Sequence, residues 1–518
     1  MKQLLHCLVG IGIPTVTRSR NSVSTVTSVK KLMVRNGVSR SLYGLDENSS
    51  QARRGVVDVV PIFCLLLFFN IQVSHAQSFY LGADLSYVNE MEDCGVTYYE
   101  AGEAKDPYAI FGENACNLVR LRLWHTPTWY DDLNEGKRYS DLADVKRAIA
   151  RAKAQEMEVL LDFHLSDNWA DPDKQVVPAA WLSVVDDTEV LADSLYNYIF
   201  QTLEDLQGED LLPEMIQIGN ETNKGILLSP EDNVTWTLDW LRNATLFNKA
   251  IRAVRDFETQ NNASVKILLH LADPDKAERL VGDFYRYGVR DFDAIGMSYY
   301  WAWHQPTSIA ETGEVVARLR ENYPEKEVFV VETGYIWTTD YNDAANNIIS
   351  ETHPDYSPAS PENQRDWMID MTQTVYDAGA SGVIYWEPAW VSSDCYTQWG
   401  RGSHQEHATF FDFDNHLITN GGIAWMSHQY EMTSSATPVQ EIPKIKIFQA
   451  SNPTEIVIKQ PYPNAKIHYR ITDISGRLLV EGKASGQALR LPLGTFDFGL
   501  YLLTVEVGNL KKTRLLLL

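Results

Sequence analysis

The chain has 518 residues, of which 45 are lysine or arginine and 69 are aspartate or glutamate, giving a formal net charge of −24. The acidity is concentrated in residues 77–443, which carry 25 basic and 61 acidic side chains, whereas residues 444–518 carry 11 and 5. Such an acidic body argues against a nucleic-acid-binding protein, which needs basic faces. The change of sign near residue 440 predicts a domain boundary there.

The first 76 residues have the features of a leader. Residues 1–50 show no sustained periodicity, and they are followed by Arg53–Arg54, the apolar run Ile62–Phe69 and the small-residue site Ser74–Ala76. This order is that of a secretory signal, and the apolar run is too short to span a membrane. We therefore expect cleavage near Ala76 and a secreted or cell-surface protein. The distance of the signal from Met1 indicates a doubtful upstream start codon.

Three cysteines remain after such a cleavage, namely Cys94, Cys116 and Cys395. An odd number in an exported protein leaves at least one thiol unpaired within the chain. Cys94 could pair with Cys116, but the sequence does not decide this. No CxxC motif or zinc-ligand spacing is present.

From residue 77 onward, eight short apolar runs alternate with amphipathic helical patterns. The expected strands are Tyr80–Leu85, Asn117–Trp124, Glu158–His164, Met215–Glu221, Lys266–Leu271, Phe292–Tyr300, Glu327–Thr333 and Gly382–Glu387. The expected helices are Asp141–Met157, Thr188–Leu206, Leu238–Thr259, Lys276–Tyr287, Ser308–Tyr323 and Asn363–Ala378. This alternation predicts an α/β fold, a (β/α)8 TIM barrel over residues 77–433. A doubly wound open sheet is the alternative, but no GxGxxG turn follows the first strand.

Chemistry in such a barrel is usually located at the carboxyl ends of the strands. Glu221 and Glu332 each stand at such an end, and paired carboxylates are what glycoside hydrolysis requires. Either glutamate alone would more simply be a helix N-terminal carboxylate or a salt-bridged surface residue. The other strand ends carry Asp84, Arg122, Trp124, His164, Asn220, His270, Tyr299, Tyr300, Trp386 and Glu387. Tryptophans are frequent at the strand ends and in the loops that follow, which favours a groove that binds sugars. They are Trp124, Trp129, Trp169, Trp301, Trp303, Trp386, Trp390 and Trp399.

An ordered set of motifs extends this interpretation. The motifs are GADLS (82–86), VRLRLW (119–124), DFHLSDNWADP (162–172), IGNE (218–221), the paired tyrosines 299–300, VVETGY (330–335) and YWEPAW (385–390). Together they resemble the endo-β-1,4-galactanase family of glycoside hydrolases, from about residue 79 to residue 432. The resemblance implies a retaining enzyme that cuts β-1,4-galactan in pectic type I arabinogalactan, with this polysaccharide as its partner.

The same resemblance implies roles for individual residues. Glu221 would be the acid/base, Glu332 the nucleophile, and Asn220 a contact of the sugar 2-hydroxyl. Trp386 would form the floor of the subsite for the cleaved sugar. The complete substrate-binding set implied is Asp84, Arg120, Arg122, Trp124, His164, Asn220, Tyr300 and Trp386, with Arg120, Arg122 and Tyr300 around the nucleophile.

The chain departs from the family pattern in three loops, which leaves subsite number and product length open. The departures are Trp301 after the paired tyrosines, Leu228–Pro230 after the acid/base loop, and Ala272–Pro274 after the fifth strand. No cofactor or metal is expected. The loop Thr338–Asp343 offers oxygen ligands for calcium, as some relatives do, but lacks a clear calcium-loop spacing.

The chain changes character after residue 433. Residues 434–443 predict a Ser/Thr/Pro linker, and residues 444–518 predict a small antiparallel β-sandwich made of short alternating runs. Its DISGRLL and LGTFDFGLYLLTV segments resemble the C-terminal sorting domain of type IX secretion substrates, which implies the secretion machinery as a partner. A carbohydrate-binding or spacer module is the alternative.

Three other functions remain open at this point. The barrel could bind a glycan without cutting it, or it could be a retaining glycosidase of the same barrel class for another β-linked polysaccharide. A metallohydrolase that uses His164 and His270 is the third, but the first strand has no HxH motif.

Overall fold

The computed structural model describes residues 79–133, 136–235 and 238–431, and further on residues 446–449, 455–459, 466–486, 488–493, 496, 499–508 and 510–517. The predicted leader (1–76) and linker (434–443) lie outside the described residues. The barrel and the C-terminal strands are therefore considered separately below.

Eight parallel strands close into a barrel in the order β1-β10-β9-β8-β7-β6-β5-β4. They are β1 (Tyr80–Asp84), β4 (Leu118–Leu123), β5 (Glu158–Phe163), β6 (Met215–Ile218), β7 (Lys266–Leu271), β8 (Ala294–Ser298), β9 (Glu327–Thr333) and β10 (Gly382–Tyr385). The predicted barrel is confirmed. Several strands end up to three residues earlier than predicted, because their last predicted residues turn out of the sheet.

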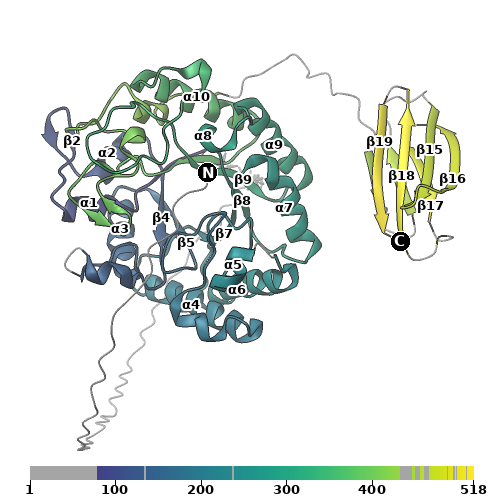
Figure 1. Cartoon of the computed structure of the whole chain (residues 1–518), viewed down its shortest axis with the longest axis horizontal. Coiled ribbons are helices and arrows are strands. Elements are labelled where there is room, and N and C mark those ends of the chain that lie inside the picture. Colours follow the sequence, from purple (N-terminus) through teal and green to yellow (C-terminus); the bar gives the residue numbers. More distant parts are fainter. Residues whose placement is uncertain are drawn as a thin grey trace, which may run out of the picture. The chain divides into compact units, whose positions relative to one another are not determined.

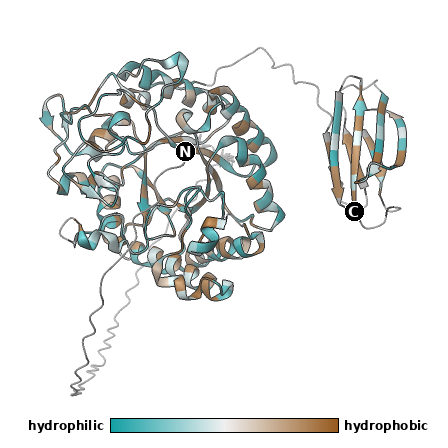
Figure 2. Cartoon of the chain, viewed as in Figure 1, coloured by the Kyte–Doolittle hydropathy of each residue, from teal (hydrophilic) through white to brown (hydrophobic). Residues whose placement is uncertain are grey.

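Helices form a ring around these strands (Figure 1). They are α1 (Val88–Asp93), α2 (Pro107–Glu113), α3 (Leu142–Ala154), α4 (Thr188–Gln207), α5 (Pro230–Thr235), α6 (Trp240–Asn261), α7 (Pro274–Arg286), α8 (Trp301–His304), α9 (Ile309–Asn322) and α10 (Pro361–Asp377). Their ends follow ordinary capping chemistry: α9 begins with a capping box between Ser308 and Glu311, and Ser360 caps α10 just before Pro361. The helices carry both hydrophobic and hydrophilic residues (Figure 2), as expected for elements with one face on a core.

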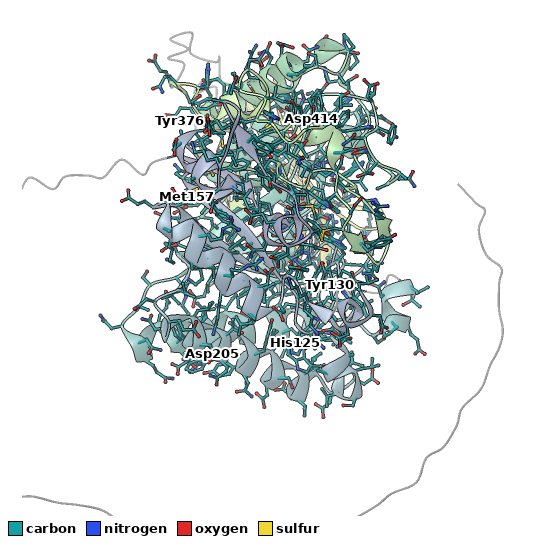
Figure 3. All side chains as sticks on the ribbon, turned by 90° about the vertical axis from the view of Figure 1, so that its left-hand side faces the viewer. His125, Tyr130, Met157, Asp205, Tyr376 and Asp414 are labelled. Carbon is teal, nitrogen blue, oxygen red and sulfur yellow. A yellow bond between two sulfur atoms is a disulfide. The ribbon has the colours of Figure 1, made fainter. Side chains whose placement is uncertain are left out.

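The barrel interior changes from apolar to polar along the strands. Its apolar layer consists of Tyr80, Leu118, Leu160, Met215, Leu268, Ala294, Phe329, Val331 and Ile384. Side chains two residues apart on a strand share a face, so the next inward positions are Arg120, Asp162, Gln217 and His270. All four are buried, and they form the base of the carboxyl-end face. Figure 3 shows the barrel from the side, with Met157, directly before β5, and Tyr130, after β4, on opposite sides.

A disulfide joins two loops at the carboxyl end of the barrel. Cys94, just after α1, is bonded to Cys395, in the loop after β10, with their Cα atoms 5.6 Å apart. Cys116 is buried and free, so the pairing of Cys94 with Cys116 that the sequence left open does not occur. Cys116 lies just before β4, and its Sγ is 3.3 Å from the carbonyl oxygen of Leu118, facing into the core.

The C-terminal strands form two antiparallel sheets, as predicted. One sheet has the order β13-β14-β17 and the other β16-β15-β18-β19. The strands are β13 (Lys446–Gln449), β14 (Glu455–Lys459), β15 (Lys466–Asp473), β16 (Leu478–Ser485), β17 (Ala488–Pro492), β18 (Leu500–Val507) and β19 (Leu510–Leu517). Ile458 of the first sheet and Ile467, Leu503 and Val505 of the second belong to one buried cluster, which makes the pair a sandwich. No helix among the described residues is long and apolar enough to cross a membrane.

Candidate active site

Glu332 lies at the end of β9 and has two close polar neighbours. Its Oε1 is 2.8 Å from Nη1 of Arg120, and the hydroxyl of Tyr300 donates to its Oε2 at 3.3 Å. Arg120 reaches it across the barrel interior, since it stands on β4, which is separated from β9 by β1 and β10. The predicted neighbourhood of Arg120 and Tyr300 around Glu332 is present.

Arg120 also binds two further carboxylates at the base of the site. Its Nη1 donates to Oδ2 of Asp84 at 2.9 Å, and its Nη2 donates to Oδ2 of Asp162 at 2.7 Å. Nη2 donates in addition to Oδ1 of Asn220 at 2.7 Å. All four side chains are buried. Together with Glu332 and Gln217, these partners hold the guanidinium in one orientation from four strands and one loop.

Glu221 reaches the same face by a different route. After β6 the chain turns sharply, with positive φ at Gly219 (75°) and at Glu221 (47°). A Cβ at position 219 would lie 2.6 Å from Thr222 Cγ2, so glycine is required there. The Ser298 hydroxyl donates to Oε1 of Glu221 at 2.6 Å. Ser298 ends β8 and is the register partner of Glu332, which places Glu221 and Glu332 beside the same pair of strands.

His270, at the inner face of β7, connects the supports of the two glutamates. Its Nδ1 is 2.8 Å from Oδ1 of Asn220, and its Nε2 is 2.9 Å from Oγ of Ser298. The amide of Asn220 is oriented by its other bonds, since Nδ2 donates to the carbonyl oxygen of Ala170 at 2.8 Å. One buried imidazole therefore fixes both Asn220 and the serine that holds Glu221.

The two glutamates differ in electrostatic environment. Burial and then the charge of Glu332 raise the pKa of Glu221 well above its usual range, while the hydrogen bond from the Ser298 hydroxyl and the more distant Arg120 charge lower it. Burial also raises the pKa of Glu332, to about 7, but the Arg120 guanidinium opposes it. The cation beside Glu332 means that the first proton bound by the pair goes to Glu221.

A cavity of about 550 Å³ opens above this pair, a size typical of small-ligand sites. It is lined by Trp169, Ala170, Asp171, Lys174, Asn220, Glu221, Tyr300, Trp303, Glu332, Asn346, Asn347, Ile348, Trp386, Trp390, Trp399 and His404. Five of the predicted site residues are in this lining: Asn220, Glu221, Tyr300, Glu332 and Trp386.

The other five predicted site residues, Asp84, Arg120, Arg122, Trp124 and His164, are buried and are not in the cavity lining. Arg122 does not contact Glu332, as the sequence had suggested, because its Nη1 donates to Oε1 of Glu387 at 3.0 Å. Its guanidinium carbon lies 4.5 Å from the ring centre of Trp124 and 4.2 Å from that of Trp169, which lines the cavity. Arg122 therefore supports a wall of the site from behind.

His164 and the loop considered for calcium are also occupied by protein contacts. Nδ1 of His164 lies 2.9 Å from Oδ2 of Asp162, and burial lowers the pKa of the imidazole. In the loop, the two carboxylate oxygens of Asp343 accept from the backbone N–H groups of Ala345 and Ser403. Over the described ranges, no group of three His, Cys, Asp or Glu side chains is arranged to hold a metal ion.

Sequence reasoning did not select Asp162, Gln217 or Ser298 as site residues. Gln217 donates to Asp162 Oδ1 at 2.8 Å, and its Oε1 accepts from Nε of Arg120 at 3.2 Å. The sequence did carry a signal for two of them. Asp162 and Gln217 are polar residues in otherwise apolar strands, at positions whose side chains point into the barrel. Ser298 had no comparable signal, since a small polar residue is common at a strand end.

Comparison with known proteins agrees with this site. The sequence model of Glycosyl hydrolase family 53 matches residues 80–420. An arabinogalactan endo-β-1,4-galactanase of Cellvibrio japonicus is 45% identical over 345 residues, covering 66% of this chain and 89% of the relative. An endo-β-1,4-galactanase of Bacillus subtilis is 31% identical over 392 residues, covering 72% and 86%.

Solved structures agree as well. The Ignisphaera aggregans GH53 catalytic domain matches with 30% identity and a TM-score of 0.61, over 68% of this chain and 96% of that one. A fungal β-1,4-galactanase structure matches with 26% identity and a TM-score of 0.55, over 68% and 100%. The match to the family model spans all eight strands of the closed barrel and both strand-end glutamates. This protein is therefore a member of glycosyl hydrolase family 53.

Proposed function

We propose that this glycoside hydrolase is a retaining endo-β-1,4-galactanase acting on pectic type I arabinogalactan. The proposal rests mainly on two glutamates that line one cavity but differ in their electrostatic surroundings. Glu221 accepts a hydrogen bond from a neutral hydroxyl, whereas Glu332 forms an ion pair with a guanidinium. Two carboxyl groups of different protonation flanking one bond are what a double displacement needs. The names of the two bacterial relatives support the choice of substrate.

In the first step, the Glu332 carboxylate attacks the anomeric carbon while Glu221 gives its proton to the glycosidic oxygen. The bond to the leaving sugar breaks and a glycosyl ester of Glu332 forms. The negative charge on Glu332 disappears in this step, and with it the repulsion that helps keep Glu221 protonated. Arg120 and Tyr300 hold the attacking carboxyl group in place before the step.

In the second step, Glu221 acts as base. It takes a proton from water, the water oxygen bonds to the anomeric carbon, and the bond to Glu332 breaks. The product has the β configuration of the substrate, and the pair returns to its starting protonation. Asn220, held by Arg120 and His270, would face the 2-hydroxyl of the cleaved sugar, and Trp386 would lie under its ring.

Azide distinguishes the proposed roles. Glu221→Ala should lose roughly 10²–10⁴-fold on galactan, but much less in the first step with an activated phenol, which needs no proton. Added azide should then speed its turnover and give the β-galactosyl azide. Glu332→Ala should fail in the covalent step, and azide should give the α-azide if any product forms. An α-azide from Glu221→Ala, a β-azide from Glu332→Ala, or near-normal galactan cleavage by either variant would contradict the assignment.

A polysaccharide panel tests the substrate. Galactan should be cut to short oligomers much faster than arabinan, mannan, xylan or cellulose. Glucans and galactans differ in one hydroxyl orientation, and a site that hydrogen-bonds a hydroxyl discriminates strongly against its absence. Faster cleavage of cellulose or mannan would overturn the substrate assignment, and binding of galactan without any cleavage would favour a non-catalytic barrel.

We propose in addition that the protein is exported and that the C-terminal sandwich serves in sorting. The signal-like residues 53–76 support export, as does the Cys94–Cys395 disulfide, since disulfides persist mainly in oxidising compartments. Intact mass spectrometry of the native exported protein should give an N-terminus near Gln77 and loss of the sandwich. A secreted chain that retained Met1 or Leu518 would contradict the corresponding half of this proposal.

A further inference from the structure

Glu387 is a buried carboxyl group that the two catalytic steps do not use. It directly follows Trp386, which would lie under the cleaved sugar, yet it is not in the cavity lining and its side chain is only 1% exposed. Its backbone is left-handed, with φ of 53°, a conformation that is uncommon for a residue with a side chain. A strained backbone that carries a buried carboxyl group beside a binding wall indicates a defined task for that group.

The side chain of Glu387 joins polar residues of two neighbouring strands. Its Oε1 accepts from Nη1 of Arg122, on β4, at 3.0 Å. The carboxyl group is also hydrogen-bonded to the carboxyl group of Asp84, at the end of β1. The hydroxyls of Tyr87 and Tyr98, on either side of α1, are the further titratable groups that its charge affects. Burial raises the pKa of both hydroxyls, so both are neutral and place no charge beside Glu387.

Two buried carboxyl groups joined by a hydrogen bond must share at least one proton. Two carboxylates can only accept, and away from water their repulsion is strong. Asp84 is the better place for the negative charge, because its oxygens accept from Nη1 of Arg120 at 2.9 Å and from the backbone N–H of Ser86 at 3.1 Å. The Ser86 hydroxyl donates to Asp84 as well. The Glu387 carboxyl group has Arg122 as its donor. The proton of the pair therefore belongs on Glu387.

The charges at the base of the site lead to the same assignment. Two guanidinium groups and five carboxyl groups meet there, namely those of Arg120, Arg122, Asp84, Asp162, Glu221, Glu332 and Glu387. The neighbouring imidazoles are neutral, since burial lowers their pKa. With Glu221 protonated, four anions and two cations would leave a net charge of −2, which a proton on Glu387 reduces to −1. Burial and then the charge of Asp84 raise the pKa of Glu387 well above its usual range, although Arg122 lowers it.

Arg122 connects this carboxyl pair to the wall of the cavity. Its guanidinium carbon lies 4.2 Å from the ring centre of Trp169 and 4.6 Å from that of Tyr87. Tyr87 in turn stacks on Trp390 with ring centres 3.8 Å apart, and both tryptophans line the cavity. Within the described ranges, Nε and Nη2 of Arg122 have no hydrogen-bond partner, so the bond to Glu387 fixes the guanidinium among these rings.

We propose that Glu387 is a positioning residue that acts as a neutral acid, donating its proton to Asp84 and accepting from Arg122. Through Asp84 it holds Arg120, which contacts the nucleophile, and through Arg122 it holds the tryptophans of the cavity wall. This inference rests on the proposed galactanase function, because it assigns how the sugar-binding wall is kept in place relative to the nucleophile. Glu387 keeps its proton through both catalytic steps and does not touch the sugar.

The pH dependence of stability tests whether Glu387 carries a proton. A carboxyl group whose pKa is raised by folding releases its proton on unfolding, so its stabilising contribution is lost as the pH rises toward the folded-state pKa. Between about pH 5.5 and 7.5, the unfolding equilibrium constant of wild type should therefore rise about tenfold per pH unit more steeply than that of Glu387→Gln. Denaturant unfolding followed by tryptophan fluorescence measures this, since every tryptophan of the chain lies before residue 426 and reports on the barrel. Parallel pH dependences would overturn the proposal.

Galactan cleavage tests the positioning role. Glu387→Gln keeps a donor for Asp84 and an acceptor for Arg122, so its kcat/KM should stay within about threefold of wild type. Glu387→Ala removes both contacts and should lower kcat/KM by roughly 10–100-fold. If Glu387 were ionised, Glu387→Gln would leave a buried guanidinium without its counter-charge and should lose as much activity as Glu387→Ala, or fail to fold.

Glu406→Gln is the matched control for placing an amide at a buried glutamate. Both oxygens of Glu406 accept, from the side chain of Asn347 and from the hydroxyl of Ser392, so an amide there must point its N–H groups at a donor. Glu406→Gln should therefore lower the unfolding midpoint, whereas Glu387→Gln should keep it near that of wild type at neutral pH. Equal destabilisation by the two replacements would contradict a neutral Glu387.

Each outcome decides between defined alternatives. If wild type does not cut galactan, the proposed function fails, while the pH dependence of stability still reports on the proton. If wild type cuts galactan but Glu387→Gln loses as much as Glu387→Ala, the neutral acid fails and the function stands. If the proton is confirmed but Glu387→Ala cuts galactan as fast as wild type, the positioning role is wrong. Should Glu387→Ala not fold, the activity and pH dependence of Glu387→Gln decide.

Discussion

The disulfide offers the most direct test of how the loops around the site are held. Cys94 follows α1, and Cys395 directly precedes the hairpin β11 (Tyr396–Thr397) and β12 (Gly400–Arg401). Trp399 lies in the turn of this hairpin and is 45% exposed in the cavity. The perturbation is the double replacement Cys94→Ala with Cys395→Ala, or reduction of the wild-type protein.

The expected loss of stability follows from the length of the loop that the disulfide closes. The two cysteines are separated by 301 residues in sequence. For a loop of this length the chain-entropy relation gives about 6 kcal/mol at 25 °C as a ceiling, and measured losses of native disulfides are typically about 2–5 kcal/mol. Since whole domains are stable by only about 5–15 kcal/mol, the bond accounts for a large share of barrel stability.

Guanidinium unfolding followed by tryptophan fluorescence measures this effect. Reductant should lower the unfolding midpoint of wild type to that of the double variant, and it should not change the double variant further. Cys116→Ala is the control, because Cys116 is free and its variant should still respond to reductant like wild type. Below the new unfolding transition, we expect a higher KM for galactan, because the hairpin carrying Trp399 has lost its attachment. An unchanged midpoint on reduction would refute the reasoning.

Three further predictions concern the catalytic pair and the turn that carries Glu221. Arg120→Lys cannot reach all three carboxylates, so the pKa of Glu332 should rise and the acid limb of the kcat/KM–pH profile should move to higher pH. Ser298→Ala removes the hydroxyl that lowers the pKa of Glu221, so the alkaline limb should also move to higher pH, again in pH profiles. Gly219→Ala should destabilise the protein by about 1–3 kcal/mol in thermal unfolding, because of its positive φ and a Cβ contact of 2.6 Å.

The strands of the barrel were predictable because their apolar runs are short and regularly spaced. The starts agree well, whereas the predicted ends at Glu221 and Tyr300 lie beyond β6 and β8. The reason is physical: the catalytic loops begin with residues that leave the sheet, as the left-handed conformations of Gly219 and Glu221 show. The short helix α1 was not predicted, because six residues provide too little periodicity.

The site was predictable at the level of strand ends, but not at the level of contacts. Glu221 and Glu332 were selected from their matched positions, and both line the cavity. The separation of Trp301 from Trp303 needed the fold, since both tryptophans follow the same strand and only their packing differs. The partner of Cys94 is 301 residues away, and no local pattern indicates a pair at that distance.

The difference between the two glutamates arises from the geometry of the barrel rather than from their own sequence surroundings. Arg120 points inward from β4 and reaches Glu332 across the interior, while its other hydrogen bonds go to Asp84, Asp162, Gln217 and Asn220. Among the residues that the structure describes, no cation lies at hydrogen-bond distance from the Glu221 carboxyl group, which accepts instead from the Ser298 hydroxyl. The Arg120 guanidinium both orients Asn220 and places a positive charge beside Glu332. Positioning of the sugar and ionisation of the nucleophile therefore depend on this single buried side chain. In the proposed mechanism, that side chain decides which of two chemically identical residues attacks and which donates the proton.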